Sequence, residues 1–397
     1  MYVTRPLSMY RKSPSTMSIQ PLDAPYSGYL VITDEEAEAE DSYCWGTCKH
    51  KKVKKLPFPQ DKILTVYHSS EYERTSATKV WFIPVPNQPL SSNRYYVIRA
   101  KGKYKGKASK CSREGDIVTC CFTDILSDKG PKPFNLKDTY QIVKIHRHQS
   151  GGFFAKSVAP DGIPPKFLRR KGWRVRISSS CRPRLSEALG LDTSIRALLP
   201  DFNFPIYKEK SDSVLVGKWY CPCVFVREEK RLKYQMKKSM FYLITLEQWW
   251  EEIYSCINVE NGGNVVVVDT DVQREVALVC GIEAVKDDRV GYNNGFVWFR
   301  AYNPNSRRVS VGLSTAIVDN MRWLQEDGGW VSGQEGEVRV ERTEEVRSQN
   351  GWKRFGCYVL VQSFGVRRLD GSLVLRYDYR HTHKIKCKWE EDNFPIS

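Results

Sequence analysis

The clearest hydrophobic pattern in the chain lies at residues 353–389. Positions 355–364 are almost all apolar, which is typical of a strand covered on both faces. Asp370-Gly371 then favours the positive φ angles of a tight turn. Residues 373–389 alternate between apolar or aromatic side chains and charged ones, so they predict extended chain with one buried face. We therefore expect a long hairpin, bent or bulged near Arg380 because the second arm is too long for one flat strand.

A different spacing, typical of helices, marks residues 245–257. Thr245 and Gln248 form a capping box, in which each side chain can satisfy a backbone donor of the other residue. The apolar residues that follow recur at helical intervals: Leu246, Trp249, Trp250, Ile253, Tyr254 and Ile257. We predict a helix here, ended by the glycines at 262–263.

Strand-like segments outnumber helical ones along the rest of the chain. Further helices are predicted at 184–199, before Pro200, and at 314–327, before two glycines. A chain of 397 residues exceeds the usual size of a single core. We predict a strand-dominated α+β fold, with mostly antiparallel sheets in two domains and a few amphipathic helices. The expected organisation is a β-rich N-terminal domain at 1–178, a linker with a helix at 179–212, and an α+β domain at 213–397 that ends in the long hairpin.

The net positive charge of the chain indicates a possible class of binding partner. The formal net charge is +16, which favours polyanions such as nucleic acid or acidic lipid headgroups. Cations occupy every second position from Arg99 through Lys101, Lys103 and Lys105 to Lys107, so a strand or hairpin here would line five of them on one face. A second cluster at 166–184 has eight Lys or Arg and no acid, and includes Arg169, Arg170 and Lys171.

These two clusters are our candidate polyanion-binding residues. The commoner explanation of the alternating cluster is an exposed edge strand whose lysines prevent aggregation. Both interpretations predict that the lysines are exposed to solvent.

Metal binding is an alternative for the second arm of the hairpin. His381, His383 and Cys387 fall on one face of the predicted strand. A His-x-His pair with a third ligand is a known zinc pattern, but no fourth ligand stands at a fixed spacing. We therefore predict no metal, and structural hydrogen-bonding roles for the two histidines. Cys44 and Cys48 are likewise interpreted as free thiols near a packed tryptophan.

The twelve cysteines bear on the cellular compartment. Several lie inside apolar strand patterns, and the chain shows neither a secretory signal nor a glycosylation sequon. We predict reduced thiols in the cytoplasm or nucleus. No apolar run reaches the length of a membrane span, so no transmembrane segment is predicted.

Five aromatic-rich blocks resemble a plant-specific family known as domain of unknown function 1262. The blocks are 1–11 (MYVTRPLSMYR), 88–98 (QPLSSNRYYVI), 216–226 (VGKWYCPCVFV), 245–254 (TLEQWWEEIY) and 381–390 (HTHKIKCKWE). The resemblance implies a plant protein whose N-terminus belongs to the family region rather than to a transit peptide. It implies no fold, activity, catalytic residue or cofactor. Cys223 departs from the family's usual Cys-Pro-Phe, so it is not expected to be a required ligand.

The absence of several catalytic and cofactor-binding motifs argues against the enzyme classes that use them. The sequence contains no dinucleotide fingerprint, phosphate loop, nucleophile elbow or His-Glu-x-x-His. We predict no catalytic residues and no cofactor, and a soluble intracellular protein that acts by binding a polyanion or a protein. The alternative is a hydrolase or transferase with an unrecognised active site. A deep pocket of polar residues with shifted pKa values would favour the enzyme.

Overall fold

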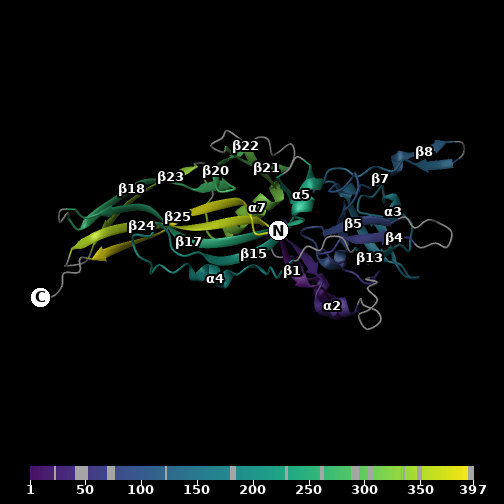
Figure 1. Ribbon diagram of the computed structural model, residues 1–397, viewed down its shortest axis with the longest axis horizontal. Helices are drawn as coiled ribbons and strands as arrows, with labels where there is room; N and C mark the ends of the chain where they lie inside the picture. Colours follow the sequence, from purple (N-terminus) through teal and green to yellow (C-terminus); the bar gives the residue numbers. More distant parts are fainter. Residues whose placement is uncertain are drawn as a thin grey trace.

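The computed structural model describes most of the chain: residues 1–21, 24–40, 52–68, 77–120, 123–178, 185–228, 231–259, 263–287, 295–302, 308–331, 333, 336–346 and 351–391. The molecule is elongated, with a smaller sheet at one end and long strands that run to the other (Figure 1). Strands dominate it, and the long hairpin lies in its largest sheet.

Twelve of the described strands form this largest sheet. Their spatial order is β16 (Val226–Arg227), β22 (Arg308–Ser314), β21 (Phe296–Tyr302), β20 (Ile282–Asp287), β19 (Glu275–Val279), β25 (Leu373–Glu391), β24 (Trp352–Arg368), β17 (Phe241–Ile257), β15 (Val214–Pro222), β1 (Tyr2–Pro6) and β2 (Gly28–Ile32), with β14 (Gly190–Leu191) paired to β15. Neighbours are antiparallel except β1 and β2, which are parallel.

A second sheet of seven described strands lies at the other end of the molecule. Its order is β11 (Phe153–Ser157), β10 (Ile142–Arg147), β6 (Arg94–Arg99), β5 (Ala77–Pro84), β4 (Leu64–Tyr67), β13 (Arg174–Ile177) and β3 (Lys52–Val53). Three antiparallel pairs complete the strands: β7 (Ser112–Arg113) with β12 (Gly162–Ile163), β8 (Ile117–Cys120) with β9 (Thr123–Leu126), and β18 (Val265–Gln273) with β23 (Glu337–Glu345).

The helices are short and few. The α-helices are α1 (Leu7–Lys12), α2 (Glu35–Glu40), α3 (Lys166–Arg169), α4 (Thr193–Leu198), α5 (Leu232–Lys238) and α7 (Thr315–Asp327). Single 3₁₀ turns occur at η1 (Pro14–Ser18), η2 (Leu90–Ser92), η3 (Glu114–Asp116), η4 (Thr139–Gln141) and η5 (Cys223–Phe225). Among the described residues, no helix combines the length and apolar character needed to span a membrane. The strand-dominated, mostly antiparallel character predicted from the sequence is confirmed.

The predicted hairpin is present as β24 and β25. Nearly every residue of β24 from Phe355 to Val366 is buried, as expected for a strand covered on both faces. Gly371 forms the turn with a φ of 87°, which glycine adopts without a Cβ clash. The expected irregularity lies just after Arg380: Leu360 pairs with His381, but its neighbour Val359 pairs with Ile385. Residues 382–384 therefore bulge out of the ladder.

The helix predicted at 245–257 is wrong, because this segment is the middle of the long strand β17. It lies between β15 and β24 and pairs with both. Thr245 bonds its hydroxyl to the Glu247 side chain, two residues along the same strand face, instead of capping a helix. Tryptophan, isoleucine, threonine and tyrosine all suit strands, so burial in a central position overrode the helical spacing.

The other two predicted helices differ in outcome. The helix at 314–327 is confirmed as α7, with Ser314 at its N-cap and Gly328 at its C-cap. The helix at 184–199 is reduced to α4 at its C-terminal end. Asp192 caps α4 by accepting a 2.9 Å hydrogen bond from the Ile195 backbone. Within the predicted helix, the described residues before Asp192 (185–191) contain only the two-residue strand β14.

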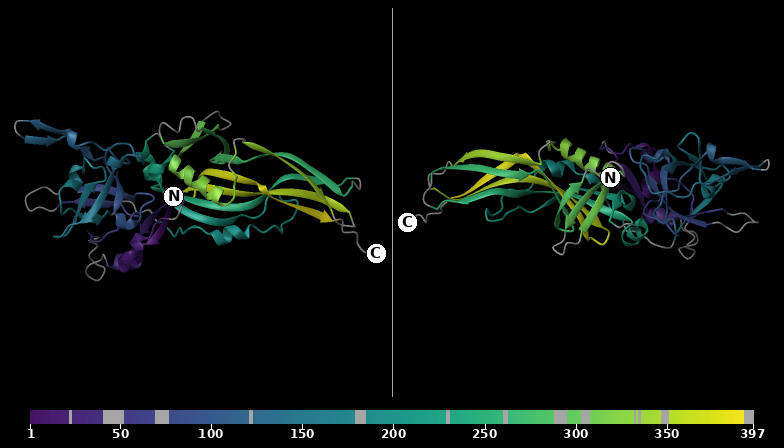
Figure 2. Two further views of the ribbon diagram at one scale, coloured as in Figure 1. Left: turned by 180° about the vertical axis from the view of Figure 1, so that it is seen from behind. Right: turned by 90° about the horizontal axis from the view of Figure 1, so that it is seen from above.

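The two large sheets meet at a continuous apolar core near the middle of the molecule (Figure 2). Trp81 of β5 packs edge-to-face on Phe241 of β17, with 4.8 Å between ring centroids. The N-terminal strands β1 and β2 belong to the sheet of the C-terminal half. The domain boundaries near 178 and 212 remain predictions, and strand pairing does not follow them at the N-terminus.

Candidate functional site

The alternating basic segment is a compact loop rather than a strand. Strand β6 ends at Arg99, and the loop closes through hydrogen bonds from the Arg99 backbone N–H to Lys107 O and from Gly106 N–H to Arg99 O, both 2.8 Å. Gly102 and Gly106 have φ angles of 80° and 87°, which interrupt extended chain. Of the strand or hairpin expected for this segment, the continuous strand is wrong, because the glycines supply tight turns; the chain folds back, and Ile98 and Ala108 form an antiparallel bridge.

Helix α5 packs directly against this basic loop. A Cβ atom on Gly106 would lie 3.0 Å from Cγ of Leu232, the first residue of α5, so the glycine permits the close approach. Lys233 and Lys237 are one helical turn apart and share one side of α5. The contact thus brings cations of α5 next to those of the loop, although more than 120 residues separate the two segments.

A pocket of about 460 Å³ lies between the loop, strand β5 and helix α5. We call it the lysine pocket. It is lined by Ile63, Lys79, Ala100, Lys101, Gly102, Lys105, Lys233, Tyr234 and Lys237. Five of these nine residues are lysines, and none is Asp or Glu. Five ammonium groups in one hollow create a strong positive potential.

Tyr234 lies next to two of these ammonium groups. The ammonium groups of Lys233 and Lys237 lie 4.8 Å and 5.9 Å from the centre of its ring. The pKa of the Tyr234 phenol is lowered, first by a hydrogen bond from Lys233 and by its charge, and then by Arg231. A negative charge on the Tyr234 phenol is thus stabilised by its neighbours Lys233 and Arg231.

The remaining predicted cations do not line the lysine pocket. Lys103 and Lys107 are exposed and lie over the ring of Tyr104, at 4.9 Å and 5.8 Å from its centre. Arg99 is half-buried, 5.0 Å from the centre of the Phe167 ring. Burial lowers the pKa of Arg99. Only Lys101 and Lys105 of the first predicted cluster therefore reach the pocket.

The second predicted cluster also lies elsewhere. Arg169 forms an ion pair with Asp128, and its Nε donates a hydrogen bond to Pro164 O at 3.1 Å. Arg170 and Lys171 are exposed at the end of α3. Sequence reasoning missed Lys79, Lys233, Tyr234 and Lys237. The spacing of Lys233 and Lys237 was a usable signal, whereas an isolated Lys79 within a strand gave none.

Of the three residues considered as metal ligands, Cys387 lies apart from the two histidines, whose ring centroids are 5.7 Å apart. His381 is fully buried, and its Nε2 lies 3.2 Å from Gln325 Oε1. Burial and the nearby charges of Lys384 and Arg196 lower the pKa of His381 to about 3. His383 is exposed, so its predicted place on the less exposed face is wrong.

Cys387 faces Cys357 rather than the two histidines, with 3.5 Å between the sulfur atoms. Within the described part of the chain, no three His, Cys, Asp or Glu side chains gather closely enough to hold a metal. Cys44 and Cys48 lie outside the described residues.

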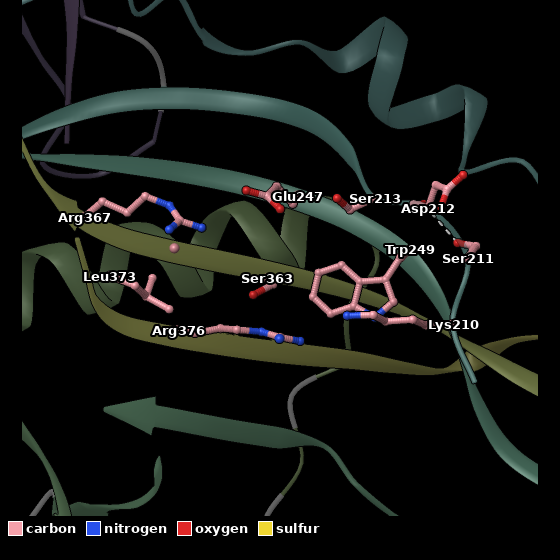
Figure 3. A pocket seen from close by; sticks show the side chains of 11 residues that line it. Lys210, Ser211, Asp212, Ser213, Glu247, Trp249, Ser363, Arg367, Leu373 and Arg376 are labelled. Atoms are coloured by element: carbon pink, nitrogen blue, oxygen red, sulfur yellow. Dashed lines mark hydrogen bonds between the residues drawn. The ribbon is translucent and has the colours of Figure 1, made fainter. Parts of the chain in front are cut away.

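A second hollow, which we call the sheet groove, lies across strands β17, β24 and β25 and the segment just before β15, and holds about 300 Å³ (Figure 3). Its lining comprises Lys210, Ser211, Asp212, Ser213, Glu247, Trp249, Ser363, Gly365, Arg367, Leu373 and Arg376. Both charge signs are present, and no histidine or cysteine lines the groove.

A buried carboxylate, that of Asp378, compensates part of the positive charge that lines the sheet groove. Asp378 is only 2% exposed, and it accepts hydrogen bonds from Ser363 Oγ and, at 2.9 Å, from Arg376 Nε. The Arg376 guanidinium also lies over Trp249, 4.6 Å from the ring centre. Ser363 therefore donates its hydroxyl to a carboxylate that is also held by an arginine, and the two side chains are buried members of one hydrogen-bonded group.

Among the described residues, the fold and the hollows thus define a strand-dominated protein with a strongly basic pocket. Residues 23–122 match the model of a family described as "Protein of unknown function (DUF1262)", which confirms the resemblance for that stretch. The stretch contains Lys79, Lys101 and Lys105, but not Lys233 or Lys237. A search of curated proteins found no match. Among solved structures, the chain is similar to the crystal structure of Cry35Ab1, with 12% identity over 84% of this chain and 90% of that one and a TM-score of 0.45.

Proposed function

We propose that this protein acts by binding an anionic ligand in the lysine pocket, without catalysis. The observation that carries this proposal is the convergence of five lysines from β5, the basic loop and α5 on one hollow whose lining contains no carboxylate. Like charges held together destabilise a folded protein, and a bound anion removes that cost. The function proposed is therefore narrower than the general polyanion contact predicted from net charge.

The predicted alternative, a hydrolase or transferase, gains no supporting observation from the described residues. The pKa shift in the lysine pocket belongs to a tyrosine at the rim, and the lining of the sheet groove contains no histidine or cysteine. A cytoplasmic or nuclear location remains part of the proposal and rests on the sequence.

Charge-matched variants test the proposal. Lys101→Glu with Lys237→Glu changes two exposed residues of the lysine pocket. Lys103→Glu with Lys238→Glu changes two exposed neighbours outside its lining. Each pair lowers the net charge from +16 to +12, because every substitution removes two units.

The measurement is the salt concentration at which each protein elutes from immobilised heparin. Binding through lysines weakens as salt rises, so the pocket variant should elute at markedly lower salt than the control variant. Equal elution of the two variants would show that total charge alone governs binding, and it would refute the proposed site.

A further inference from the structure

We infer that Cys357 and Cys387 form a reversible disulfide when the protein meets a peroxide, which makes the pair a site of oxidative modification in the long hairpin. This inference goes beyond the proposed function and does not depend on it, because β24 and β25 lie in the large sheet, away from the lysine pocket (Figure 1). It rests on the register of the two strands, the distance between the two sulfur atoms and the hydrogen bond between them.

The bulge in β25 sets the two cysteines opposite each other. Before the bulge, Leu360 pairs with His381, so an uninterrupted ladder would place Cys357 opposite Lys384. The bulged residues shift the register, and Cys357 pairs directly with Cys387 instead. Opposed residues on antiparallel strands have Cα atoms about 4.5 or 5.5 Å apart, and both distances lie within the range of about 4.4 to 6.8 Å that a disulfide spans. The backbone of the hairpin therefore already meets the requirement for a bond.

The two side chains also point at each other. Their sulfur atoms are 3.5 Å apart, and the Cys387 thiol donates a hydrogen bond to Cys357 Sγ. A disulfide has about 2.0 Å between its sulfur atoms, so rotation of the two side chains closes the gap without moving the strands. Both cysteines pack in one apolar cluster with Val266 and Val268 of β18, which holds them in place.

The shared hydrogen bond makes the two thiols unequal. It lowers the pKa of Cys357 and raises the pKa of Cys387. Burial opposes the Cys357 thiolate, the charge of Arg342 favours it, and Glu344, paired with Arg342 at 2.9 Å, opposes it. Cys387 is half-buried whereas Cys357 is buried. An oxidant therefore reaches Cys387 first, and the Cys357 thiolate is in place to accept its proton.

The reaction takes two steps. In the first, Cys387 Sγ attacks one oxygen of hydrogen peroxide while its proton passes to the Cys357 thiolate; the O–O bond breaks, and the hydroxide that leaves takes a proton from solvent. Cys387 is then a sulfenic acid. In the second, Cys357 Sγ attacks Cys387 Sγ, the S–O bond breaks, and the leaving hydroxide takes the Cys357 proton. The two sulfur atoms have lost two electrons, and the peroxide has been reduced to water.

Peptide mapping by mass spectrometry tests the inference on the full-length protein. The protein is reduced, freed of reductant, treated with about one equivalent of hydrogen peroxide, alkylated and digested without reduction. We expect two peptides linked through Cys357 and Cys387 within one chain, about 2 Da lighter than the sum of the two thiol peptides, and separated again by dithiothreitol. Oxidation of Cys387 to a sulfinic acid without the link, or a link between two copies of the chain, would overturn the inference.

Serine variants separate this pair from the other thiols. Cys256 supplies the matched control, because it is also half-buried and packs in the same apolar cluster. Cys256→Ser should keep the link, whereas Cys387→Ser should leave Cys357 free to be alkylated after denaturation. If Cys357 links to another cysteine just as fast in Cys387→Ser, the register of the hairpin does not select the pair and the inference is wrong.

The oxidised protein should also be more stable than the reduced protein. A bond between Cys357 and Cys387 restricts the unfolded chain across the hairpin turn, so the oxidised wild type should unfold at a higher urea concentration. Reduction should remove the difference, and Cys387→Ser should show none. A linked protein that unfolds at lower urea than the reduced form would contradict the claim that the paired strands accommodate the bond.

Discussion

The lysine pocket and the sheet groove are both open hollows lined by charged side chains, but they differ in the sign of those charges. The groove is lined by both cations and carboxylates, and the charged residues of the pocket lining are all lysines. In the groove, Arg376 bonds to the buried Asp378 and lies over Trp249. In the pocket, five lysines share a lining without a single carboxylate. The groove's central charges are explained by partners within the chain, whereas the charged residues that line the pocket are all lysines and offer their cations to an anion from outside.

Paired charges and clustered like charges have opposite effects on the stability of the fold. A paired, partly buried charge contributes to the fold, and removing one member leaves the other unsatisfied. Several like charges held together destabilise the fold, so their removal should affect a ligand rather than stability. The predictions below test this separation, beginning with the largest expected effect.

Breaking the pair beneath the sheet groove should cost stability. Asp378→Ala leaves the Arg376 guanidinium and the Ser363 hydroxyl without their partner, so the free energy of unfolding should fall by about 2 to 4 kcal/mol. Arg367→Ala is the control, because it lies in the same groove and should change stability by no more than about 0.5 kcal/mol. Urea unfolding measures both, and equal values for the two variants would contradict the assigned structural role.

Ligand should stabilise the protein through the lysine pocket alone. A heparin oligosaccharide at 100 times its Kd should raise the free energy of unfolding of the wild type by about 2.7 kcal/mol. The pocket variant, if its Kd is tenfold weaker, should gain about half as much at the same concentration. Asp378→Ala should keep the full gain despite its lower baseline. An equal gain in wild type and pocket variant would place the ligand elsewhere.

His381 offers a buried group to compare with the exposed lysines. Its replacement by Ala leaves Gln325 without a partner and should cost about 1 to 3 kcal/mol near pH 7.5. The pKa of His381 is about 3 in the folded protein and near the ordinary histidine value of about 6.5 when the chain is unfolded. The unfolded state therefore takes up a proton first as the pH falls, and the advantage of the wild type should shrink between about pH 6.5 and 3.

Urea unfolding of the wild type and His381→Ala at pH 7.5, 5.5 and 4.5 tests this dependence. A difference that stays constant with pH would show that His381 is not kept neutral by burial. Chelators should leave the melting temperature unchanged, and stoichiometric zinc lost together with stability would contradict the structural role of the histidines.

A thiol count on protein that has met no oxidant should give the smallest change. The described cysteines whose side chains can be assessed are free: Cys111, Cys221, Cys223, Cys256, Cys280, Cys357 and Cys387. Titration of the denatured, unreduced protein should find close to all twelve thiols of the sequence. A lower count would contradict the predicted reducing compartment, and Cys357 and Cys387, whose sulfur atoms are 3.5 Å apart, are the first pair to check.

The sequence predicted local features well where one pattern had one explanation. The hairpin turn at Asp370-Gly371 and the helix from Ser314 were both signalled by turn or cap residues that act locally. The prediction of a helix at residues 245–257 was wrong because their apolar spacing suits a helix as well as a strand buried on both faces. The neighbours β15 and β24 decided between the two, and they are distant in the chain.

The candidate site could be predicted only in part for the same reason. Lys101 and Lys105 were identified, but the pocket exists because Gly106 lets Leu232 approach. The strict alternation of charge did not indicate that Gly102 and Gly106 would turn the chain back on itself. The partners Lys79 and Lys237 enter through the packing of β5 and α5, which residue order alone does not reveal.

The most direct test of the central claim is acetylation of lysines on the full-length protein, followed by mass spectrometry with and without a heparin oligosaccharide. The lysines compared are neighbours in sequence, so each serves as a control for the other. We predict that ligand slows the acetylation of Lys101, Lys233 and Lys237, which line the pocket, and leaves Lys103, Lys107 and Lys238 unchanged. Equal slowing of both sets, or slowing of neither, would contradict a ligand site in the lysine pocket.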